Sequence, residues 1–225
     1  LGMLRPDMKP GMQTPTGKME LWNTTMETFF PENPDDILPN YAEAPLSRTE
    51  RPELEEEYPL ICNTGRRIPV YFHSEHRQLP WTRELWPVPR VEINPQTAEE
   101  YGIEQGDWVW IETEWGKIRE VADLYYGVPK NVINCEHTWW YPELSQDAGH
   151  GFQLSAVNQL IDNSAQDPHC GSSNLRGYLA KIYKATPENS PFNNPVPCAS
   201  DGTPIIHTSD DPRLKEWLPT YEGRE

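Results

Sequence analysis

Short runs of apolar residues, each closed by turn residues, recur from the middle of the sequence to near its end. Residues 108–112 alternate Val109 and Ile111 with two tryptophans, a period of two that is typical of a strand with two distinct faces. Strands are expected at residues 59–62, 91–93, 108–112, 117–124, 131–135 and 175–185. The last segment fits a strand or a helix, and its alternation favours a strand. Short strands at this spacing favour a small β-barrel over a doubly wound sheet.

One short helix interrupts these strands. Asn94 has the side chain of a helix N-cap, Pro95 suits the first helical position, and Gly102 is a typical C-terminal stop. The pattern therefore predicts a helix from Pro95 to just before Gly102.

The two ends of the chain have a different pattern. Proline is abundant, with 24 residues, and the apolar content is low at 36%. We expect residues 1–57 to form an extended arm, residues 58–185 the barrel, and residues 186–225 a tail. Within the arm, residues 14–22 predict a turn followed by a short apolar strand. Residues 79–89 are expected to be a rigid aromatic connection.

The first expected strand delivers a polar loop that suits an anion. Its apolar run ends at Cys62, and the glycine of the following Asn-Thr-Gly turn leaves the backbone open to a ligand. Arginine offers a planar fork that matches phosphate oxygens. The polar side chains that follow this turn are Arg66, Arg67, His73, Ser74, His76 and Arg77. A solvated arginine loop between two strands is an equally good interpretation of this stretch alone.

The distribution of charge favours the anion site. The net charge of −16 argues against nucleic acid or an anionic membrane surface as a partner, because both would be repelled. Residues 61–90 nevertheless carry five arginines, no lysine and two acids. A local positive site on an acidic protein is a better indication of an anionic ligand than a generally basic chain.

Other site chemistries have weaker signals. The four cysteines lack paired metal-ligand spacing, which argues against an iron–sulfur cluster or structural zinc, and Cys62 and Cys135 fit buried apolar positions. His73 and His76 have no third metal ligand at a defined spacing. Ser74 lacks the glycine context that exposes a serine nucleophile. No apolar run approaches the length of a membrane span, and no signal peptide is found.

Taken in order, the loop motifs resemble the C-terminal region of the dimethyl sulfoxide reductase family of molybdenum and tungsten enzymes. The resemblance covers roughly residues 1–185, and the ordered series is more specific than any one motif. The motifs are TPTGKMEL at 14–21, NTGRR at 63–67, YFHS at 71–74 with Arg77, VEINP at 91–95, GI at 102–103, GDWV at 106–109, HTWWYPE at 137–143, NQL at 158–160 and DPHCG at 167–171.

The resemblance implies a mainly β fold with short helices, a six-stranded double-psi barrel that binds molybdopterin guanine dinucleotide, with molybdenum or tungsten in the full-length enzyme. The cofactor contacts that it implies are Thr64, Gly65, Arg66, His73, Ser74, Arg77, His137, Asn158 and Arg176. The iron–sulfur cysteines and the protein ligand to the metal lie in earlier domains of that family. This chain alone is therefore expected to be inactive.

The resemblance also implies partners and a class of reaction. Expected partners are the remaining domains of the catalytic subunit and an iron–sulfur electron-transfer subunit, in a folded enzyme of the cytoplasm or of the periplasm or cell surface. The segments at 72–74 (FHS) and 139–143 (WWYPE) look closest to those of the polysulfide or thiosulfate reductase branch and of the catechol hydroxyl-handling branch. Two rival classes are a non-catalytic interaction module of the same barrel type and a small hydrolase that uses His73 or His76.

Overall fold

The computed structural model describes residues 7, 11–66, 68–164 and 166–190, without the side chain of Arg66. The chain divides into two compact units, Leu1–Glu43 and Ala44–Glu225. The expected arm at residues 1–57 therefore spans both units. Most of the expected tail, from residue 191 onward, lies outside the described residues.

The first unit has little core of its own. Asn23 caps α1 (Thr24–Phe29) by accepting hydrogen bonds from the amides of Thr25 and Met26. The 3-10 helix η1 (Pro34–Ile37) supplies Ile37, the one buried residue among the described residues of this unit. The predicted turn forms, since the Gly17 amide donates to the Thr14 carbonyl. The short apolar strand that was predicted after this turn does not form, so that prediction was wrong. The sequence pattern also did not predict α1.

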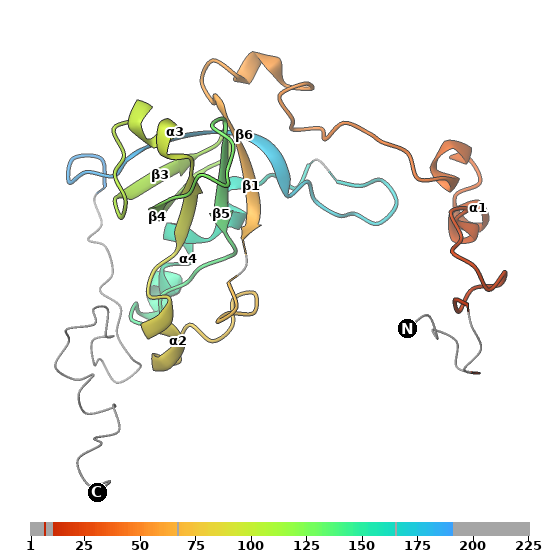
Figure 1. The fold of residues 1–225 in the computed structure, drawn as a ribbon, viewed down its shortest axis with the longest axis horizontal. Coiled ribbons are helices and arrows are strands. Elements are labelled where there is room, and N and C mark those ends of the chain that lie inside the picture. The colour runs from red at the N-terminus through yellow and green to blue at the C-terminus, as the bar shows by residue number, and fades with distance from the viewer. Residues whose placement is uncertain (1–6, 8–10, 67, 165, 191–225) are drawn as a thin grey trace, which may run out of the picture. The chain divides into compact units, whose positions relative to one another are not determined.

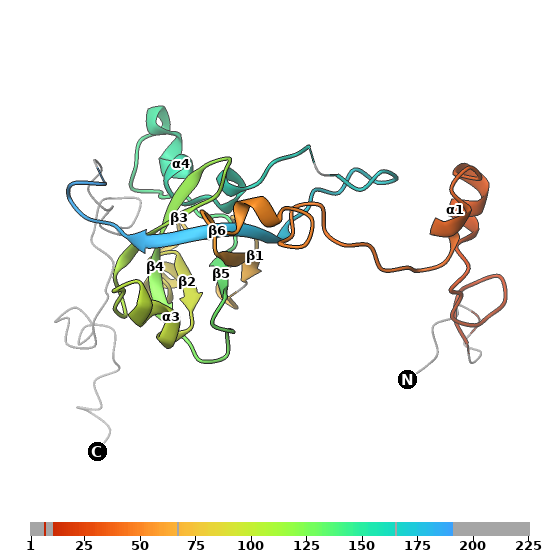
Figure 2. The ribbon, with the colours of Figure 1, turned by 90° about the horizontal axis from the view of Figure 1, so that it is seen from above.

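Six strands of the second unit form a closed barrel (Figure 1). The ring order is β1-β5-β2-β4-β3-β6, and β6 lies between β1 and β3 (Figure 2). The strands are β1 (Leu60–Arg66), β2 (Arg90–Ile93), β3 (Trp108–Glu112), β4 (Lys117–Leu124), β5 (Val132–Glu136) and β6 (Arg176–Lys184). The predicted mainly β barrel is confirmed.

The ring has an internal two-fold symmetry. If β1 is exchanged with β4, β2 with β5 and β3 with β6, every pair of neighbouring strands in the ring is kept. It also exchanges the parallel pair β1–β5 with the parallel pair β2–β4. A crossed connection is needed to bring each parallel pair together, as in the double-psi barrel that the resemblance implies.

Apolar side chains from all six strands fill the barrel. Val91, Ile111 and Ile133 are fully buried there. Cys62 and Cys135 are buried as predicted, with their sulfur atoms 3.4 Å apart on neighbouring strands. The core is continuous, and its cysteines act as small apolar residues.

Helices and turns connect the strands. The predicted helix is α3 (Pro95–Glu100), capped by Asn94, which accepts a hydrogen bond from the Gln96 amide. The helix α2 (Pro80–Leu85) lies where a rigid connection was expected, and α4 (Phe152–Ser155) and η4 (Val157–Leu160) lie between β5 and β6 in the sequence. The remaining 3-10 helices are η2 (Pro52–Leu54) and η3 (Gln146–Gly151). None of the helices in the described part of the chain is long and apolar enough to cross a membrane.

Two segments differ from the prediction in ways that matter for the site. The first strand does not end at Cys62 but continues to Arg66, with irregular pairing to β5 beyond Asn63. Residues 44–57 pack on the barrel instead of extending from it. Leu46 joins the core, and the Arg48 guanidinium donates to the Pro59 carbonyl over 2.6 Å.

We expect the chain to fold without a ligand, because the barrel core closes with apolar side chains alone. Ile133→Ala should then lower the free energy of unfolding by about 2–5 kcal/mol, since it leaves a cavity at a fully buried site. Chemical denaturation followed by circular dichroism measures this. The control Tyr126→Ala changes a side chain that is 78% exposed and should stay within about 0.5 kcal/mol. A wild-type chain without a cooperative transition would contradict the prediction.

Candidate functional site

The topology brings three chain segments to one edge of the barrel. Strands β1 and β5 run parallel, so their carboxyl ends share this edge, where Arg66 pairs with Glu136. Strand β6 runs antiparallel to β1 and begins at the same edge, where Arg176 pairs with Asn63. The predicted site residues at 64–66, 137 and 176 therefore lie in or directly after three neighbouring strands, although they are far apart in the sequence.

A pocket of about 320 Å³ lies against the outer face of β1 and β5. Its lining residues are Asn63, Thr64, Gly65, Gly127, Val128, Pro129, Val132, Asn134 and Arg176. Arg176 is the cation among them. Its exposed guanidinium stands beside Gly65, where an added Cβ would lie 3.8 Å from Nη2. The pocket thus combines an arginine, two amide side chains and an open backbone.

Gly65 has a φ of +94°, a backbone conformation that residues other than glycine rarely adopt. Thr64 is buried, and its hydroxyl donates to the Leu175 carbonyl over 2.5 Å. This bond ties the end of β1 to the residue before Arg176. Thr64 therefore fixes the shape of the pocket more than it offers a free hydroxyl. The side chain of Arg66 and the whole of Arg67 lie outside the described residues.

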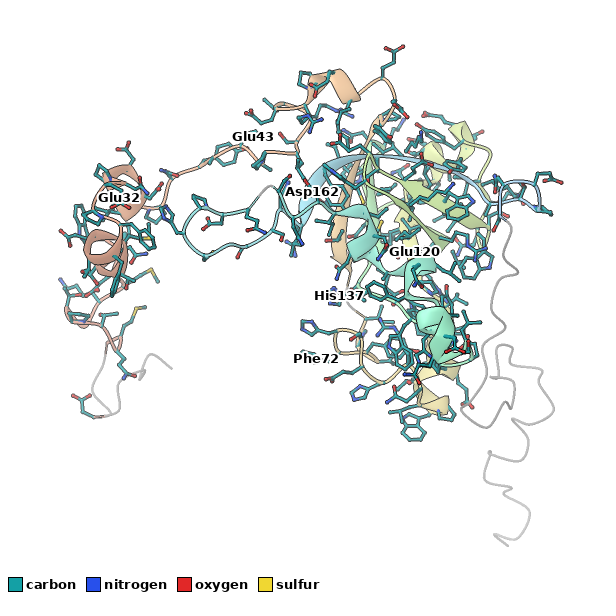
Figure 3. All side chains as sticks on the ribbon, turned by 180° about the vertical axis from the view of Figure 1, so that it is seen from behind. Glu32, Glu43, Phe72, Glu120, His137 and Asp162 are labelled. Atoms are coloured by element: carbon teal, nitrogen blue, oxygen red, sulfur yellow. The ribbon has the colours of Figure 1, made fainter. Side chains whose placement is uncertain are left out.

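A second group of predicted residues lies on the loops after β1 and β5. His73 Nδ1 and His137 Nε2 are 3.3 Å apart, and their rings meet edge to face with centroids 5.0 Å apart. His137 and the neighbouring Phe72 point from the same side of the unit (Figure 3). Ser74 is exposed, and its carbonyl accepts a hydrogen bond from the Trp140 indole over 2.5 Å. We call His73 and His137 the histidine pair.

Arg77 lies beneath the histidine pair and is 1% exposed. Its guanidinium carbon is 4.7 Å from the ring centroids of both Tyr71 and Trp139. Burial lowers the pKa of Arg77 to about 10, while the charge of Glu136 opposes this shift. Arg77 therefore keeps its positive charge at neutral pH inside an aromatic cluster.

The structure does not bring Asn158 to either group. It is exposed on η4, which packs on the turn between β3 and β4, where a Cβ at Gly116 would lie 2.4 Å from the Gln159 carbonyl oxygen. Among the described residues, no group of three or more His, Cys, Asp or Glu side chains could hold a metal ion. His73 and His76 both have positive φ angles, of 52° and 71°.

Sequence reasoning missed the buried charges that support these loops. Arg83 forms a two-point contact with Glu143, with N–O distances of 2.9 and 3.1 Å, and both side chains are buried. Glu136 accepts hydrogen bonds from the Trp86 indole and the Arg90 amide. Glu120 is fully buried and accepts from the Glu136 amide (Figure 3). These pairs join segments that are distant in the sequence, so no local sequence pattern predicts them.

Glu143→Ala should destabilise the protein by about 3–5 kcal/mol, because it leaves the buried Arg83 guanidinium without its carboxylate. Replacing both partners by apolar residues, Arg83→Met with Glu143→Leu, should cost much less. Urea unfolding measures both. The control Glu57→Ala removes a partner of Lys181 that is 62% exposed, and it should shift the midpoint little. If the urea midpoint of Glu143→Ala were no lower than that of the control, the prediction would be wrong.

A protein-family model matches most of the barrel. Residues 60–179 match the family model described as "Molydopterin dinucleotide binding domain". The chain is 75% identical over 219 residues to the dopamine dehydroxylase of Eggerthella lenta, covering 97% of this chain and 21% of that protein. It is 34% identical over 180 residues to the acetylene hydratase of Syntrophotalea acetylenica, covering 77% of this chain and 24% of that protein.

A solved structure has the same fold. The acetylene hydratase from Pelobacter acetylenicus superposes with a TM-score of 0.68 at 32% sequence identity, over 82% of this chain and 26% of that one. The chain thus spans about a fifth to a quarter of the length of these relatives.

Proposed function

Because the chain belongs to the Molydopterin dinucleotide binding domain family, we propose that its barrel edge holds molybdopterin guanine dinucleotide within the catalytic subunit of a molybdenum or tungsten oxidoreductase. The observation that carries the proposal is the pocket against the outer face of β1 and β5, which has Arg176 beside the glycine backbone of position 65. The protein ligand to the metal and any iron–sulfur cluster would come from the rest of that subunit.

The pocket fits a nucleotide portion of such a cofactor. Arg176 supplies a charged fork for a phosphate oxygen, and Gly65 lets a phosphate approach the backbone. Asn63 and Asn134 add amide side chains, and the Asn134 amide already donates to Glu92 over 2.7 Å. A volume of about 320 Å³ is at the lower end for ligand pockets, so only part of a dinucleotide would lie inside.

The histidine pair lies on the same edge and offers ring nitrogens to another part of the same ligand. When bound, the metal–pterin group supplies two-electron redox chemistry. The residues of this chain bind and orient it, and the buried aromatic cluster behind the pair keeps water away from that side. On the basis of the family resemblance, we propose that Arg66 and Ser74 also contact the cofactor.

Arg176→Ala in the full-length enzyme should weaken cofactor binding roughly ten- to hundredfold. A charge-assisted contact to phosphate is worth about 1.5–3 kcal/mol, at about 1.4 kcal/mol per tenfold change in affinity. The measurement is the metal and pterin retained after dilution into mild denaturant. Arg51→Ala is the matched control, since Arg51 pairs with Glu53 and Glu114 and does not line the pocket. Equal retention in both folded variants would exclude the pocket as the phosphate site.

We also propose that the full-length enzyme removes a hydroxyl group from a catechol. The support is the 75% identity to a dopamine dehydroxylase across nearly the whole chain. The reaction adds two electrons and two protons to the catechol and releases the monophenol and water. The rival within the family is a polysulfide or thiosulfate reductase. A non-catalytic interaction module is favoured by no feature of the pocket.

An assay with the full-length enzyme tests this assignment. With a reduced viologen dye as electron donor, we expect consumption of a catechol panel and a monophenol product 16 mass units lighter, the mass of the oxygen atom lost. The matched monophenols serve as controls and should not turn over. Turnover of thiosulfate or polysulfide, with no catechol consumed, would overturn the assignment and leave the cofactor proposal standing.

A further inference from the structure

The buried guanidinium of Arg77 joins the two loops that carry the histidine pair. Its Nη1 donates to the His73 carbonyl over 2.8 Å, and its Nη2 donates to the His137 carbonyl over 3.1 Å. A longer contact of 3.5 Å reaches the Glu75 carbonyl. These donors all point to the main chain, and the side chain is 1% exposed.

Two aromatic rings contact this guanidinium. Tyr71 and Trp139 each stand 4.7 Å from its central carbon. The Tyr71 hydroxyl donates to the Trp86 carbonyl over 2.7 Å, which holds that ring in turn. Arg83 also contacts the Trp139 ring, with its guanidinium carbon 5.5 Å from the ring centroid, and donates to the Arg77 carbonyl. The fork of Arg77 is therefore held from several sides before any ligand binds.

The loop that carries His73 needs such support. His73 has a φ of 52° and His76 a φ of 71°, each in the left-handed region. For a residue other than glycine, such a conformation costs about 1–3 kcal/mol, and it persists only where the surrounding structure imposes it. Arg77 binds the carbonyl of His73 itself, and Thr82 donates its hydroxyl to the carbonyl of His76 over 2.5 Å.

We infer that Arg77 is a positioning residue for the histidine pair and does not itself touch the cofactor. One planar fork sets the carbonyls of His73 and His137, 64 positions apart in the sequence, and so brings their imidazoles within 3.3 Å. The inference rests on the proposed function in one respect: the pair is taken to face the dinucleotide. The resemblance implied a direct contact for Arg77, whereas its burial and carbonyl partners assign it an indirect role.

Histidine reactivity tests the positioning without reference to the cofactor. Full-length enzyme produced without cofactor is treated with diethyl pyrocarbonate, and peptides are quantified by mass spectrometry. Arg77→Lys should raise the modification rates of His73 and His137 several-fold, because an ammonium lacks the planar fork that reaches the two carbonyls in a fixed geometry. His169, on a separate loop, is the internal reference. Arg48→Lys is the matched control, an arginine that also binds a carbonyl, that of Pro59.

A second variant keeps the test valid if Arg77→Lys does not fold. Tyr71→Leu removes one ring from the guanidinium and leaves every donor of Arg77 in place. It should raise the reactivity of both histidines by a smaller factor. Unchanged reactivity of His73 and His137 in a folded variant of either kind would overturn the inference.

A double-mutant cycle in the holoenzyme distinguishes positioning from direct contact. His73→Gln and Arg77→Lys should each speed cofactor release about tenfold, and the double variant should also be near tenfold, because both act through one contact. A release rate about a hundredfold faster in the double variant would mean independent contacts and would overturn the indirect role. If reactivity rises but neither single variant changes release, the positioning stands and the proposed cofactor contact of the pair fails.

Discussion

The parallel pairing of β1 with β5 is the constraint on which the candidate site depends. Parallel neighbours place their carboxyl ends at the same edge, and these two strands can meet only through a crossed connection. The loop after β1 and the loop after β5 therefore lie side by side, and β6 adds Arg176 from the antiparallel direction. An apolar interior closes the ring and packs behind the strands whose ends form this edge.

Behind that edge, the protein buries charge instead of excluding it. Arg77 and Arg83 flank Trp139, while Glu143, Glu136 and Glu120 supply the opposing charges or hydrogen bonds nearby. Hydrophobic residues of similar volume would often give equal or greater stability. What the ionic groups add is direction, because a guanidinium fork defines the positions of two carbonyls in a way that a leucine cannot. The loops that carry the histidine pair are thus specified by hydrogen bonds more than by apolar packing.

The acidic surface and the local arginines fit together. The sequence carries a net charge of −16, yet Arg176 stands exposed in a pocket with an open glycine backbone. A small anion with further hydrogen-bonding groups suits such a pocket. Family membership and the physical character of the pocket therefore agree on the class of ligand.

Local pattern determined the β elements of this protein, the helix at 95–100 and its Asn94 cap, because alternation, capping and turn chemistry act within a few residues. It also identified the glycine turn and His73 as site candidates, and the family resemblance added His137. Only the tertiary structure decided that β1 continues to Arg66, that residues 44–57 pack on the barrel and that Arg77 points inward. The same holds for the Arg83–Glu143 pair and for the separation of Asn158 from the pocket. Each of these depends on contacts between segments far apart in the chain, and such contacts leave no periodic signal in a single sequence.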